Sequence, residues 1–165
     1  MNEIKEEEKR PTGLLVLFIL TTIYTSLKLL GSIGNILSGP PDAKELKLIK
    51  VEMAKSMKAA KEMGSDYLVD FIEKMGIISD ATLANFMLFN FISFLFYGLG
   101  LAAAILMFKR MKLGFHLYIG YSFILLIQYY FFVNPSDVPL SLLIWEGLLS
   151  LLFIFLYSRH LKWMQ

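Results

Sequence analysis

Two charged side chains, Lys28 and Glu146, each lie within a long apolar stretch of the 165-residue chain. A charge near the centre of a bilayer costs at least about 2.5–3.5 kcal/mol, so such residues usually face a bundle interior and pair. At about 1.5 Å per helical residue, Lys28 lies about 8 Å and Glu146 about 10 Å below the outer membrane boundary. One interpretation is a Lys28–Glu146 ion pair; the other is separate extension of the Lys28 side chain to the outer headgroups.

Other polar side chains lie at similar depths. Tyr24 shares a helical face with Lys28, Asn85 and Asn90 lie in the second apolar stretch, and Gln128 lies in the third. Together with the two charges they are concentrated in the outer half of the expected membrane. This concentration predicts an outward-facing polar pocket. Hydrogen bonding between packed helices, with no pocket, is the alternative.

These residues are positioned by four apolar stretches, in a chain that is 56% hydrophobic. An apolar core about 30 Å thick is crossed by about 20 helical residues, which each stretch supplies. We therefore expect an all-α integral membrane protein with an antiparallel four-helix transmembrane bundle. The expected spans are residues 13–38, 81–108, 115–133 and 140–161.

Basic residues set the expected orientation, because Lys and Arg in short segments are retained on the cytoplasmic side. They occur in the leader (1–12), in the second connection (109–114) and around the C-terminal tail (162–165), whereas the connection 134–139 has none. We expect both termini to be cytoplasmic, in a multi-pass protein of the bacterial inner (plasma) membrane.

The segment 39–80 is expected to be an extracytoplasmic amphipathic helical insert. Asp42 can cap a first helix. Gly64-Ser65-Asp66 is typical of a C-cap followed by the N-cap of a second helix, about 67–75, that ends at Gly76. Ser79 or Asp80 would then cap the second membrane span. The insert could lie on the outer leaflet, bind a membrane-protein partner through residues 42–75, or pack on its own protein. Its first helix has one apolar stripe: Leu46, Ile49, Met53, Met57 and Ala60.

Several functional classes lack the residues that they need. The chain has no cysteine, which excludes thiol chemistry and Cys-ligated metals, and a net charge of +2 gives no reason to expect nucleic acid. His116 and His160 lie at expected helix ends without a carboxylate motif, so we expect no metal and no cofactor. Nucleotide-binding and hydrolase motifs are absent from the sequence.

Three functions remain, and the first is favoured. It is a non-enzymatic accessory or scaffolding subunit that binds partners through the insert and the bundle. The second is an outward-facing protein that binds or transports a small molecule or lipid in a Lys28/Glu146 polar pocket. The third, an intramembrane enzyme with Glu146 as acid–base, lacks a second catalytic group, so an enzyme is the less favoured class.

Overall fold

The computed structural model describes residues 11–165, and within that range it is helical without a β-strand. This confirms the all-α prediction; residues 1–10, most of the predicted leader, lie outside the described range. Three short 3₁₀ segments, η1 to η3, join or follow the α-helices. The elements are α1 (Thr12–Ser38), α2 (Ala43–Glu62), α3 (Asp66–Ala84), α4 (Phe86–Phe108), α5 (Lys112–Ile127), η1 (Gln128–Phe131), η2 (Pro135–Asp137), α6 (Leu140–Ser158) and η3 (Leu161–Trp163).

Three helices of the described chain, α1, α4 and α6, are long and apolar enough to cross a membrane. The third expected span, 115–133, differs because α5 has 16 residues and the chain then tightens into η1. The Tyr129 carbonyl accepts hydrogen bonds from the N–H groups of Phe132 and Val133, which turns the chain. Such tightening is common at the ends of α-helices.

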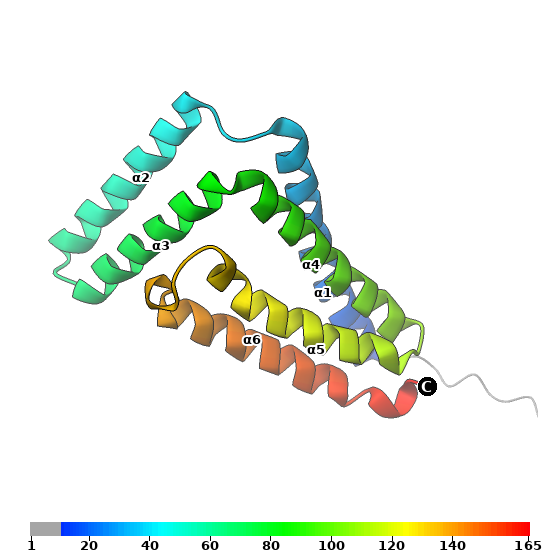
Figure 1. Ribbon diagram of the computed structural model, residues 1–165. Helices are drawn as coiled ribbons and strands as arrows, with labels where there is room; N and C mark the ends of the chain where they lie inside the picture. The colour runs from blue at the N-terminus through cyan, green and yellow to red at the C-terminus, as the bar shows by residue number, and fades with distance from the viewer. Residues whose placement is uncertain (1–10) are drawn as a thin grey trace, which may run out of the picture.

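The four apolar helices pack as consecutive antiparallel neighbours, α1 against α4, α4 against α5, and α5 against α6 (Figure 1). By contrast, α1 and α6 make few contacts, and these lie near the two chain ends. There Thr21 bonds to Tyr157, and Gly13 lies beside His160. Toward the opposite end the two helices diverge (Figure 1).

Helices α2 and α3 form a hairpin that leaves the other four helices at an angle (Figure 1). The expected caps are confirmed: Asp42 and Glu45 form a capping box at α2, and Ser65 Oγ accepts from Leu68 N–H at α3. Between them Gly64 adopts a φ of 66°, a left-handed conformation that favours glycine. Ala60 of the apolar stripe is buried.

The predicted end of the second insert helix at Gly76 is wrong, because α3 continues to Ala84 and α4 follows after Asn85. Neither Ser79 nor Asp80 therefore caps a membrane span. Glycine inside a helix costs only about 1 kcal/mol, and here it makes room for the neighbouring helix. A Cβ on Gly76 would lie 3.0 Å from the Met53 sulfur of α2. The glycine thus allows close packing within the hairpin.

Candidate functional site

A cavity of about 330 Å³ lies between α1, α4, α5 and α6. Three of the predicted site residues, Tyr24, Gln128 and Glu146, line it from α1, η1 and α6. Of the three, Gln128 is buried, Glu146 is half-buried and Tyr24 is 49% exposed. The other lining residues are Leu20, Thr21, Tyr97, Tyr118, Tyr121, Ser122, Leu125, Leu149, Ser150 and Phe153.

Tyrosine rings from all four helices form a continuous cluster along this cavity. The ring centroids of Tyr24 and Tyr97 are 6.0 Å apart, and those of Tyr97 and Tyr121 are 6.4 Å apart. The cluster continues from Tyr121 to Tyr118 at 5.7 Å, and from Tyr118 to Tyr157 at 5.0 Å. Aromatic pairs at these separations attract one another. The cluster therefore holds the four helices together while leaving ring surface on the cavity.

Glu146 has one carboxylate oxygen engaged and one free. The Tyr129 hydroxyl donates to Glu146 Oε1 at 3.3 Å. Oε2 is buried and accepts no hydrogen bond from any described residue, and the buried Tyr121 hydroxyl is also without a partner. A buried polar atom left unpaired costs about 1–3 kcal/mol, more when charged. Both unpaired atoms belong to residues that line the cavity.

A polar contact joins α1 and α6 beside the cavity, which Thr21 lines. A hydrogen bond of 2.9 Å joins Thr21 Oγ1 and Tyr157 Oη, and both residues are buried. Thr25 Oγ1 donates to the Thr21 carbonyl at 2.7 Å, which satisfies that hydroxyl within α1. Hydrogen bonds between helices, such as the one between Thr21 and Tyr157, are a usual means of joining apolar helices.

Lys28 lies beside the cavity without lining it. Its side chain is exposed, and Nζ is 5.9 Å from the centroid of the Tyr24 ring. In the described part of the chain no ion pair within 4 Å joins Lys28 to Glu146, whose Oε1 is bonded to Tyr129 instead. Among residues 11–165 the Lys28–Glu146 ion pair, one of the two interpretations of the sequence, is therefore not formed.

The two predicted asparagines lie elsewhere. Asn90 is buried between α1 and α4, where Oδ1 accepts from Asn35 Nδ2 at 2.9 Å and Nδ2 donates to the Phe86 carbonyl at 2.8 Å. Asn85 lies exposed at the break between α3 and α4, and its Nδ2 donates to the Ala81 carbonyl. Asn90 joins two helices and Asn85 ends one, so neither reaches the cavity.

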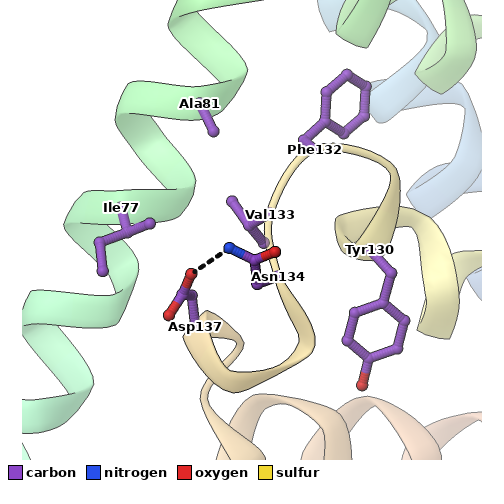
Figure 2. Close-up of a pocket in the computed structure, with 7 residues that line it drawn as sticks. All are labelled: Ile77, Ala81, Tyr130, Phe132, Val133, Asn134 and Asp137. Atoms are coloured by element: carbon purple, nitrogen blue, oxygen red, sulfur yellow. Dashed lines mark hydrogen bonds between the residues drawn. The ribbon is translucent and has the colours of Figure 1, made fainter.

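A second hollow, of about 370 Å³, lies between α3 and the link from α5 to α6. Figure 2 shows its seven lining residues and the hydrogen bond in which Asn134 Nδ2 donates to Asp137 Oδ2 at 3.4 Å. Ser136 Oγ donates to the other oxygen of Asp137 at 3.2 Å. Both carboxylate oxygens are thus engaged by neighbours in the same loop, and the interhelical cavity is the better candidate site.

No group of three His, Asp or Glu side chains that could hold a metal is found among residues 11–165. The two histidines lie in different surroundings: His116 Nδ1 is 3.1 Å from the Lys112 carbonyl, and His160 packs against Gly13.

Ten of the thirteen cavity residues, among them Tyr118 and Ser122, were not among the predicted site residues. A signal for these two exists, because Tyr118, Ser122, Leu125 and Gln128 recur every three or four positions and share one helical face.

Comparison with known proteins gives no match to a family model, a curated protein or a solved structure. The function is therefore inferred from the geometry of the cavity.

Proposed function

We propose that this chain is a multi-pass integral membrane protein in which α1, α4, α5 with η1, and α6 form a transmembrane four-helix bundle. Within α6, which the structure describes in full, only Tyr157 is buried, so an apolar helix has a broad exposed face available to lipid. The helix α5 and η1 together extend about 32 Å, enough for a core about 30 Å thick. Large apolar side chains are exposed along α1 and α6: Leu15, Ile19, Ile23, Leu27, Leu30, Leu140, Ile144, Leu148, Leu151 and Phe155.

The function that the geometry supports best is binding or transport of a small molecule or lipid in the interhelical cavity. The observation that carries this proposal is the free, buried Oε2 of Glu146 in a cavity shared by four helices. At about 330 Å³ the cavity falls within the range of about 300–1,000 Å³ typical of small-molecule sites. Its apolar and aromatic walls with few polar groups are also typical of such sites.

The cavity faces outward in this proposal. The turn between α4 and α5, with Lys109 and Lys112, lies at the same end as the C-terminus (Figure 1). Basic residues mark the cytoplasmic side, so this end is assigned to the cytoplasm of a plasma membrane, the inner membrane in a bacterium. Glu146 and Gln128 lie toward the other end, where α1 and α6 diverge.

Single-cysteine labelling tests this arrangement cleanly, because the natural chain has no cysteine. In right-side-out vesicles treated with a small membrane-impermeant maleimide, we expect Ser136→Cys to be labelled and Lys109→Cys to be labelled only after the membrane is opened. Ser150→Cys, in the cavity, should be labelled from outside, whereas Leu151→Cys, its exposed apolar neighbour, should face lipid and stay unlabelled.

Two results would contradict the proposal. Labelling of Lys109→Cys in sealed vesicles would show that this turn is not cytoplasmic, which contradicts the assigned orientation. Equal resistance of Ser150→Cys and Leu151→Cys would show that the cavity does not admit water or solutes.

An accessory or scaffolding role through residues 42–75 is the second candidate, because the α2–α3 hairpin leaves the other helices at an angle (Figure 1). The hairpin also keeps apolar side chains exposed. Leu48 is 57% exposed, and Tyr67 is 61% exposed. Crosslinking in native membranes should give a partner adduct that is lost in the Leu48→Ser/Tyr67→Ser variant and kept in the matched Lys47→Ser variant. An adduct unaffected by either change would refute hairpin docking.

A further inference from the structure

We propose that the interhelical cavity recognises an ammonium group, with Glu146 as its counter-charge; this inference rests on the proposed binding function of the cavity. The starting point is the chemistry of the two unpaired atoms. Glu146 Oε2 is an acceptor when the carboxyl is ionised, and the Tyr121 hydroxyl oxygen also has lone pairs. An ammonium group supplies positive charge to both, and N–H donors where it carries hydrogens.

The aromatic lining points to the same ligand chemistry. Tyr24, Tyr97, Tyr118 and Tyr121 all line the cavity that contains Glu146. The face of an aromatic ring carries partial negative charge and attracts organic cations, and cages of several rings are a recurring means of holding quaternary ammonium groups. A carboxylate beside several rings therefore combines the two features that select a cation over a neutral molecule of equal size.

The charges around the cavity disfavour an anion. None of its lining residues is Lys, Arg or His, and Lys28, whose Nζ is 5.9 Å from the centroid of the Tyr24 ring, is exposed and does not line it. A carboxylate or phosphate placed in the cavity would face the like charge of Glu146, which is unfavourable in a medium of low dielectric constant.

The size of the cavity sets the size of the group. A volume of about 330 Å³ is at the lower end of the usual range for ligand sites, which suits a small alkylammonium group rather than a large drug-like molecule. The same ammonium chemistry occurs in small soluble amines and in ammonium-bearing lipid headgroups. Both sources fit the proposal, and a comparison of two bilayers separates them.

The test compares choline with its uncharged isostere, 3,3-dimethylbutan-1-ol, on the full chain in phosphatidylglycerol nanodiscs, with saturation-transfer NMR titration as the readout. We expect choline to bind about tenfold more tightly than the isostere, a preference that Glu146→Gln removes. The exposed hairpin variant Glu52→Gln is the matched control and should keep it. Tyr24→Phe should retain choline binding better than Tyr24→Leu, because it retains the ring.

A second arm uses phosphatidylcholine nanodiscs. Weaker choline binding there would support the proposal with a lipid headgroup as the source of the ammonium group. Unchanged binding would support it with a soluble amine as the source.

Failure of this inference and failure of the proposed function give different results. Equal binding of choline and the isostere, insensitive to Glu146→Gln, would overturn the ammonium inference while leaving a binding cavity. Absence of binding by both probes, with Ser150→Cys still labelled from outside, would also overturn the ammonium inference alone. Absence of both binding and labelling would overturn the binding function itself.

Discussion

Replacing Gly114 with alanine is expected to lower the free energy of unfolding by about 3 kcal/mol, the upper end of the usual cost of overpacking. Gly114 lies in the first turn of α5, where α5 closely approaches the end of α4. An added Cβ would be 2.5 Å from the backbone nitrogen of Met107 and 2.7 Å from the carbonyl oxygen of Ala103. Non-bonded atoms need about 3.5 Å, so the helices would have to separate by about 1 Å. Backbone atoms cannot rotate away as a side chain can.

The matched control is Gly120→Ala in the same helix, where an added Cβ would meet nothing within 4 Å. Both substitutions gain similar helix propensity, about 1 kcal/mol relative to glycine, so their difference isolates the clash. Thermal unfolding of the purified proteins in one detergent, followed by size-exclusion chromatography, provides the comparison. If Gly114→Ala unfolds at the temperature of Gly120→Ala, the close approach of α4 and α5 is not a determinant of stability.

Gly114 also illustrates why the packing could be predicted only in part. Apolar stretches and capping residues are local features, so the sequence was sufficient for the helical class, the caps at Asp42 and Ser65, and three apolar helices. Which glycine permits a close approach depends on the neighbouring helix. Both Gly76 and Gly114 are glycines within a helix, and the sequence does not distinguish them. In the structure Gly76 lies against a methionine sulfur of the neighbouring helix, whereas Gly114 lies against backbone atoms.

The candidate site could likewise be predicted only in part. Depth and helical face were sufficient to place Tyr24, Gln128 and Glu146 at one level, and the structure puts all three on one cavity. Depth does not determine pairing. Lys28 is long and lies near a ring that it can reach, and Tyr129 is the nearer partner of Glu146 because η1 brings its hydroxyl over α6. The tightening of the chain into η1 was not visible in the hydropathy of the stretch 115–133.

The second large expected effect on stability concerns the C-terminal segment. The sequence predicted residues 162–165 as a short cytoplasmic tail, whereas in the structure this segment packs against the turn between α4 and α5. The N–H of Lys112 donates to the Gln165 carbonyl at 3.1 Å, and the N–H of Gln165 donates to the Arg110 carbonyl. The Arg110 guanidinium carbon is 4.4 Å from the centroid of the Trp163 ring. Arg110 has a φ of 69°, an unfavourable conformation for a non-glycine residue, and these contacts help to hold it.

Trp163→Ala is therefore expected to lower the free energy of unfolding by about 3–5 kcal/mol, as for other buried tryptophans. The Trp163 side chain is 8% exposed, whereas Trp145 in α6 is 64% exposed and should face lipid, so Trp145→Ala is the matched control with a small expected effect. Thermal unfolding in detergent measures both variants, and amide hydrogen exchange at 109–112 should accelerate in Trp163→Ala alone. Equal unfolding temperatures, with exchange at this turn unchanged, would show that the C-terminal segment does not stabilise the end of the bundle.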